Sequence, residues 1–264
     1  MKSGDEIRNL VRERYGAIAR EADACCGAPD AGLNLIGGAY EAVDGHVACA
    51  DLNLGCGVPT QHAALRPGEM VLDLGSGAGN DAFIARHGVG AEGHVIGVDM
   101  TPQMVVKARA NADKLGFANV EFRLGEIEHL PVESGSVDVI ISNCVLNLLP
   151  DKAPAFAEMY RVLKGGGRFC VSDIVATAPL PDVVRKAAAL YVGCIGGAME
   201  QSAYLALIGK AGFSDVRIAS ARPIVFADEE IEKVLAAQMS AEEIAAVRGS
   251  GVGLVSITVM AQKP

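Results

Sequence analysis

The sequence predicts an α/β protein built on a doubly wound parallel sheet. Short apolar stretches typical of strands alternate with helical stretches over residues 71–174, and the connections between them are short. A glycine-rich turn follows the first strand, and the second strand ends in an acid. With 264 residues, 50% of them hydrophobic, the chain can form one sizeable α/β domain with an attached lobe.

The stretch Val71–Asp81, VLDLGSGAGND, is the centre of this prediction. It begins as a strand, turns at three glycines and enters a helical stretch that runs from Asp81 to Arg86. Glycine permits a tight turn and close approach of a ligand, and the helix N-terminus offers free N–H groups. The next strand, His94–Asp99, ends in an acid 20 residues after Gly79. A carboxylate there can accept both hydroxyls of a ribose.

Two cofactors fit such a turn, a dinucleotide or S-adenosylmethionine. The glycines alternate as G-x-G-x-G, whereas the usual dinucleotide pattern is G-x-G-x-x-G. S-adenosylmethionine carries an ammonium and a sulfonium but no pyrophosphate, so an acid such as Asp73 suits it. The order D-L-G-S-G-A-G resembles the cofactor loop of class I S-adenosylmethionine-dependent methyltransferases, which implies a Rossmann-like sheet. The alternative is a turn that binds nothing.

The other elements follow in order. A charged helix is predicted at 5–21, then a glycine- and alanine-rich connector to about residue 50. Thr101 and Pro102 suit the N-cap and first position of a helix that reaches about Leu115. Further strands are predicted at 120–124, 137–142, 168–174, 215–219 and 252–260, and helices at 153–163, 181–193, 202–212 and 228–238. We expect an N-terminal helix and cysteine-bearing arm (1–66), an α/β core (67–177) and a C-terminal lobe with strands that complete the sheet (178–264).

Composition narrows the possible partners and location. A net charge of −9, without clusters of Lys and Arg, argues against a nucleic-acid partner. The longest apolar runs are too short to span a membrane, and the charged N-terminus leads into no apolar signal core. We therefore expect a cytoplasmic protein, a monomer, whose seven cysteines are thiols rather than a structural disulfide framework.

Three of the cysteines are expected at the edge of the sheet where ligands bind. Cys144 follows the fourth predicted strand, Cys194 lies in the lobe after the fifth, and Cys56 lies in a loop before the first. Because ligands of open α/β sheets bind beyond the carboxyl ends of the strands, these thiols could meet above the cofactor. Three thiolates suit a soft ion. The sequence contains no C-x-x-C pair, so a zinc ribbon is not expected. We interpret Cys170 as a small core residue, and Cys49 matches no motif.

Four segments resemble motifs of the arsenite S-adenosylmethionine methyltransferases, and the resemblance covers nearly the whole chain. The segments are NLGCGVP at 53–59, SNCVLNL at 142–148, YVGCIGG at 191–197, and VRERYG at 11–16 leading to CCG at 25–27. The family implies that thiolates of Cys56, Cys144 and Cys194 hold trivalent arsenic, as arsenite and then methylarsenite. The arsenic lone pair can then attack the sulfonium methyl without a general base, and catalysis comes from positioning and exclusion of water.

The resemblance also implies a reduction step and a set of cofactor contacts. Cys25 or Cys26 could form a disulfide with Cys56, which thioredoxin or glutathione would then reduce. Which of the two vicinal cysteines acts stays open, and the alternative is a loop cysteine pair with no catalytic duty. The implied cofactor residues are Asp73, Gly75, Ser76, Gly77, Asp99 and Met100, with Glu126 and Ile127 at the adenine and Asn143 near the methionine part. Glu128 and His129 read as surface or turn residues.

The chain also departs from the family. Larger members carry an extra C-terminal domain, so this chain resembles the compact form, and residues 42–50 do not follow the expected pattern. Three other functions stay open. They are a methyltransferase of a small organic acceptor, a non-catalytic arsenic- or antimony-binding protein, and a redox-sensing thiol protein.

Overall fold

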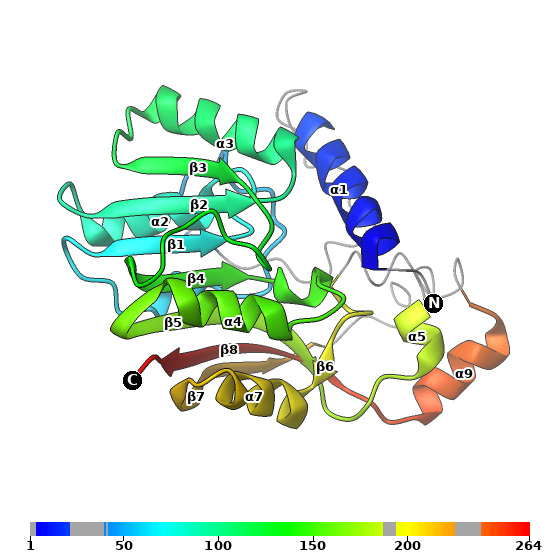
Figure 1. The fold of residues 1–264 in the computed structure, drawn as a ribbon. Helices are drawn as coiled ribbons and strands as arrows, with labels where there is room; N and C mark the ends of the chain where they lie inside the picture. Colours follow the sequence, from blue (N-terminus) through cyan, green and yellow to red (C-terminus); the bar gives the residue numbers. More distant parts are fainter. Residues whose placement is uncertain (1–3, 22–39, 41, 187–193, 225–238) are drawn as a thin grey trace.

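The computed structural model describes residues 4–21, 40, 42–186, 194–224 and 239–264. Within these residues, one twisted sheet runs through the molecule with helices on both faces, which confirms the predicted doubly wound α/β class (Figure 1). The helix predicted at 228–238 and residues 187–193 of the helix predicted at 181–193 lie outside the described part.

The strand order is β3-β2-β1-β4-β5-β8-β7, with the short β6 paired to β5. Neighbouring strands from β3 to β5 are parallel, whereas β8 runs antiparallel to both β5 and β7. The strands are β1 Met70–Leu74, β2 His94–Asp99, β3 Val120–Leu124, β4 Val137–Asn143, β5 Leu163–Ala176, β6 Met199–Glu200, β7 Ser214–Pro223 and β8 Leu254–Gln262.

Helices cover the two faces of the sheet. Val71 of β1 packs with Phe83 of α2 on one face, and Leu72 packs with Phe156 of α4 on the other. A central strand buried on both faces explains the nearly continuous apolar sequence of β1. The helices are α1 Gly4–Glu21, η1 Pro59–Gln61, α2 Asn80–Val89, α3 Pro102–Leu115, η2 Leu146–Leu148, α4 Ala153–Val162, α5 Asp182–Lys186, α7 Gln201–Lys210 and α9 Ala241–Gly249.

Helix α1 lies beyond the carboxyl ends of the central strands (Figure 1). Ile18 and Ala19 pack against Met104 of α3, and Val11 is buried next to η2. Arg8 and Arg12 of the same helix form ion pairs with the loop after β3. The charged helix that the sequence predicted therefore covers the edge of the sheet where ligands bind.

Some boundaries differ from the sequence expectations. Strand β5 is longer at both ends than predicted, because Leu163 pairs with Val137 of β4 and residues 168–176 pair continuously with β8. Thr101 stands at the N-cap of α3, but its side chain makes no capping hydrogen bond. Helix α9 was not predicted, although Ser240 and Glu243 form a complete capping box at its start.

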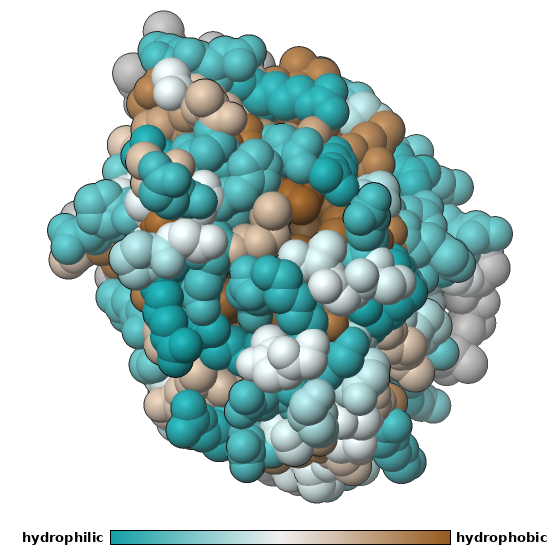
Figure 2. All heavy atoms as spheres, turned by 60° about the vertical axis from the view of Figure 1, so that its left-hand side comes forward, coloured by the Kyte–Doolittle hydropathy of each residue, from teal (hydrophilic) through white to brown (hydrophobic). Residues whose placement is uncertain are grey.

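The surface is mainly polar. One face shows hydrophobic side chains only as small areas between hydrophilic ones (Figure 2). The large hydrophobic residues exposed in the described part are Val106, Leu115 and Leu124. None of the described helices combines the length and the apolar character that crossing a membrane requires.

Replacement of Gly97 by alanine tests the packing beneath the glycine turn. A Cβ on this β2 residue would overlap the Phe122 ring and approach Ser76 Oγ to 2.8 Å. We expect Gly97→Ala to lower the free energy of unfolding by about 1–3 kcal/mol, measured by urea denaturation. Gly209→Ala in α7, where the new Cβ meets nothing within 4 Å, is the matched control and should be neutral or slightly stabilising. Equal stability of Gly97→Ala and wild type would contradict this packing.

Candidate functional site

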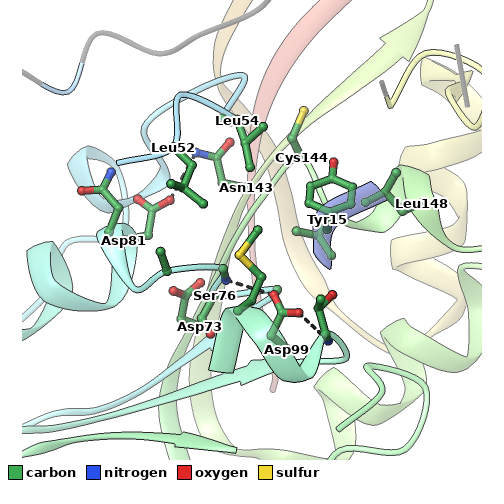
Figure 3. Close-up of a pocket in the computed structure, with 18 of the residues that line it drawn as sticks. Tyr15, Leu52, Leu54, Asp73, Ser76, Asp81, Asp99, Asn143, Cys144 and Leu148 are labelled. Carbon is green, nitrogen blue, oxygen red and sulfur yellow. Dashed lines mark hydrogen bonds between the residues drawn. The ribbon is translucent and has the colours of Figure 1, made fainter. Parts of the chain in front are cut away.

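A pocket opens beyond the carboxyl ends of β1, β2 and β4, beneath α1. Its wall includes most of the residues that the sequence predicted as cofactor contacts, together with Val11 and Tyr15 of α1 (Figure 3). The predicted residues in the wall are Asp73, Gly75, Ser76, Gly77, Asp99, Met100, Ile127 and Asn143. Their convergence follows from topology, because parallel strands deliver their C-terminal residues to one edge.

The glycine turn has the backbone that its sequence requires. Gly75, Gly77 and Gly79 have φ values of 68°, 52° and 102°, in the left-handed region that favours glycine. A Cβ on Gly75 would overlap Val145, whereas one on Gly77 would meet nothing within 4 Å. Gly77 therefore leaves space on the pocket side, and its N–H donates to Asp99 Oδ2 at 3.0 Å.

The carboxylates of Asp73, Asp81 and Asp99 lie together in the pocket wall. Asp99 Oδ1 also accepts from the Thr101 N–H at 2.8 Å, which fixes this carboxylate at the end of β2. One oxygen of Asp73 and one of Asp81 are buried without a hydrogen-bond partner in the protein, and so is the hydroxyl of Ser76. Buried polar atoms without partners are costly, so these groups are expected to meet a polar ligand.

These acids repel one another when they are charged. Burial raises the pKa of Asp73 well above its usual range, and repulsion from Asp81 and Asp99 raises it further. Burial likewise raises the pKa of Asp81 to about 6, although hydrogen bonds from Tyr40 and Asn143 oppose the rise. A ligand with positive charge would relieve this repulsion, whereas a pyrophosphate would increase it.

Asn143, at the end of β4, joins the pocket to the loop that carries Cys56. Its Oδ1 accepts from the backbone N–H groups of Cys56 at 3.1 Å and Gly57 at 3.3 Å. Its Nδ2 donates to the Gly57 carbonyl at 2.7 Å and to Asp81 Oδ2 at 3.2 Å, and it also contacts the Tyr40 hydroxyl. One amide thus fixes the Cys56 loop against the start of α2.

The acid beside Ile127 differs from the one that the sequence predicted. Glu128 lies in a turn, as the sequence suggested, but it is only 7% exposed and lines the pocket, so it is not a surface residue. The predicted Glu126 is half-buried, pairs with Arg12 at 3.4 Å and is absent from the pocket wall. A tight turn, in which the His129 N–H donates to the Glu126 carbonyl at 3.1 Å, separates the two acids.

Cys56, Cys144 and Cys194 meet in one buried cluster, as their positions relative to the strands predicted. Their exposed fractions are 0%, 5% and 4%, and Val11, Leu148, Ile174 and Ala198 pack around them. The Cys144 side chain lies against those of Cys56 and Cys194. The Cys194 thiol also donates to the Cys144 carbonyl at 2.7 Å. Cys144 itself lines the pocket, so the cluster adjoins the proposed cofactor space.

Two of these cysteines have an unusual backbone. Cys144 and Cys194 adopt φ values of 60° and 65°, which non-glycine residues rarely do. Such strain persists only where surrounding contacts impose it, and it is common at functional sites. Here the Cys144 N–H donates to the Ser172 carbonyl at 2.8 Å, and a Cβ on Gly197 would overlap the Asn147 carbonyl.

The thiols of Cys56 and Cys144 are protonated at neutral pH. Burial raises the pKa of Cys144 well above its usual range and raises that of Cys56 as well. As they stand, no three or more His, Cys, Asp or Glu side chains of the described chain have the arrangement of a metal-ion site. The Cys194 thiol must therefore leave its carbonyl partner before all three sulfurs can face one ion.

The other cysteines stand apart from this cluster. Cys170 is buried in β5 within the core, as predicted, and Cys49 is exposed. Cys25 and Cys26 lie outside the described residues. Two tyrosines at the site were missed by sequence reasoning. Tyr15 lay within the recognised VRERYG segment, whereas no local signal marks Tyr40, which donates to Asp81 Oδ2 at 2.8 Å.

Comparison with known proteins first identifies the class of protein to which the chain belongs. Residues 65–212 match the family described as a methyltransferase domain. An arsenite methyltransferase of Halobacterium salinarum is 47% identical, over 98% of this chain and 67% of its own length. The mouse arsenite methyltransferase is 34% identical, over 89% of this chain and 65% of its own. The chain belongs to the arsenite methyltransferase family.

Solved structures agree with this assignment. The crystal structure of an arsenic(III) S-adenosylmethionine methyltransferase from Chlamydomonas reinhardtii superposes with a TM-score of 0.63 and 38% identity. The match covers 75% of this chain and 64% of that one. The chain thus spans about two thirds of the length of these relatives.

Proposed function

We propose that this protein transfers the methyl group of S-adenosylmethionine to trivalent arsenic held by Cys56, Cys144 and Cys194. The observation that carries the proposal is the juxtaposition of a buried three-cysteine cluster with an acid-lined pocket. Three sulfur donors suit a soft ion such as arsenic(III). Family membership supports the same activity.

The residues of the pocket fit S-adenosylmethionine. The unpartnered oxygens of Asp73 and Asp81 would meet its ammonium, Asp99 the ribose hydroxyls, and Ile127 with Glu128 the adenine. We propose Glu128 for the adenine amine because it lines the pocket and Glu126 does not. When bound, the cofactor supplies an electrophilic methyl group on a sulfonium.

The buried thiols can bind arsenic without first forming free thiolates. Arsenous acid can condense with three thiols, so that each thiol proton leaves with an arsenic-bound hydroxyl as water and three As–S bonds form. The product is uncharged, so a site that disfavours free thiolates can hold it. The arsenic lone pair then forms the As–C bond as the C–S bond of the sulfonium breaks, and the positive charge passes to arsenic.

A redox step would return arsenic to the trivalent state. The thiolate of Cys25 or Cys26 would attack the arsenic-bound sulfur of Cys56. As the Cys56 S–As bond breaks, its electron pair reduces arsenic, and the new disulfide leaves methylarsenic(III) on Cys144 and Cys194. Thioredoxin or glutathione would then reduce the disulfide.

Speciation of arsenic tests the reaction. Incubation with arsenite, S-adenosylmethionine and a thiol reductant should yield mono- or dimethylated arsenic, measured by chromatography with mass detection. Cys144→Ser should lower the rate by about 100-fold or more because the acceptor is no longer held in line with the methyl. Cys49→Ser, at an exposed cysteine, is the matched control and should retain the wild-type rate.

The rival functions correspond to other results of that experiment. Arsenite binding without methylation would favour a sequestering protein. Neither binding nor methylation would favour an organic acceptor, and equal rates in Cys144→Ser and wild type would exclude the proposed ligand set.

Cofactor affinity should depend on pH through Asp81. Its pKa of about 6 means that the carboxylate is charged above pH 6 and attracts a cation, and is neutralised as pH falls. We expect S-adenosylmethionine to bind more weakly below pH 6, approaching about tenfold per pH unit, measured by calorimetry from pH 8 to 5. Asp81→Asn should bind more weakly at pH 8 and show a smaller change. An affinity that rises toward acid would contradict the proposed role of the acids.

Arsenite binding should exchange no protons with the buffer at pH 7. Because Cys56 and Cys144 carry raised pKa values, their protons are present before binding and leave within water. The calorimetric enthalpy should therefore be the same in two buffers of different ionisation enthalpy. Cys194→Ser, in which the other two thiols bind arsenic, should behave likewise. Uptake of two protons per arsenic would show that these thiols are already ionised.

A further inference from the structure

Tyr15 of α1 reaches both halves of the site. Its side chain lines the pocket and packs against the cysteine cluster, with its hydroxyl close to the Cys194 side chain. Figure 3 shows Tyr15 beside Cys144 and Leu148, on the side of the pocket nearest the thiols. The ion pair of Arg8 with Glu128, at 3.2 Å, and that of Arg12 with Glu126, at 3.4 Å, hold α1 in this position.

The three thiols are held in different ways. Asn143 fixes the backbone at Cys56, and the Ser172 carbonyl fixes the backbone at Cys144. Lys152 Nζ, at 2.9 Å from the Gly197 carbonyl, holds the loop of Cys194. The Cys194 side chain itself is oriented by its own proton, which it donates to the Cys144 carbonyl.

That orienting bond cannot survive arsenic binding, because the thiol proton is lost when the As–S bond forms. The sulfur then offers only lone pairs and needs a donor. The Tyr15 hydroxyl is such a donor, already in contact with this sulfur, and its pKa is raised by burial, so it keeps its proton.

We propose that Tyr15 is a positioning residue for Cys194, which makes arsenic bind through three sulfurs rather than two. The inference rests on the proposed function, since it concerns the same arsenic site. Arsenite has three exchangeable hydroxyls, whereas phenylarsonous acid has two and needs only two thiols, which Cys56 and Cys144 can supply while Cys56 is reduced. Replacement of Tyr15 should therefore weaken the binding of arsenite and leave the binding of phenylarsonous acid nearly unchanged.

The experiment compares Tyr15→Phe with wild type for both arsenicals. Arsenite affinity should fall about tenfold in Tyr15→Phe, the loss of one hydrogen bond to the arsenic-bound sulfur, while phenylarsonous acid affinity changes less than about twofold. X-ray absorption should find three As–S bonds in wild type, and two As–S and one As–O bond in the variant. Tyr160→Phe makes the same chemical change where the ring packs on Phe213, and is the matched control.

A double-mutant cycle separates positioning from a general structural effect. In a Cys194→Ser background, Tyr15→Phe should cause no further loss of arsenite affinity, whereas a merely structural role would give additive losses. Three As–S bonds and unchanged affinity in Tyr15→Phe, or equal losses for both arsenicals, would overturn this inference alone. Fewer than three As–S bonds in wild type would overturn the proposed ligand set and this inference with it.

Discussion

The site depends on the hydrogen bonds of one amide, that of Asn143. Its oxygen holds the Cys56 loop and its nitrogen reaches Asp81 at the start of α2. Because a side-chain amide has distinct donor and acceptor ends, only one orientation satisfies both sets of partners. The end of β4 thereby sets the distance between a thiol from the N-terminal region and the acids of the pocket, while the next residue, Cys144, supplies a second thiol.

The two halves of the site have opposite electrostatic character. The pocket gathers acids whose mutual repulsion a cation relieves, whereas the cysteine cluster is apolar and holds neutral thiols. In the proposed reaction, a methyl group that moves from a sulfonium to arsenic would take positive charge from the first region to the second. The methylated arsenic would then be a cation in an apolar site, which would favour its prompt reduction or release.

Local sequence signals predicted the fold, and most of the residues that they marked as cofactor contacts lie in the pocket wall. The glycine turn and Asp99 follow from backbone needs within a few residues, and the meeting of Cys56, Cys144 and Cys194 follows from strand topology. The sequence pointed to Glu126 for the adenine, whereas a tight turn after β3 places Glu128 in the pocket wall. Tyr40 and Tyr15 act through contacts distant in sequence, which no local pattern encodes.

Side chains of β7 and β8 form hydrogen bonds with the backbone of Cys56, the first cysteine of the cluster. Ser256 Oγ in β8 donates to the Cys56 carbonyl at 2.6 Å, and Arg222 in β7 donates to the same oxygen at 3.2 Å. All three cysteines of the cluster are synthesised well before these partners. On the ribosome, the Cys56 loop therefore lacks both anchors until residues 254–262 have emerged and paired with β5. The complete cysteine cluster therefore forms only after residues 254–262 have been synthesised, so shorter nascent chains lack the proposed arsenic site.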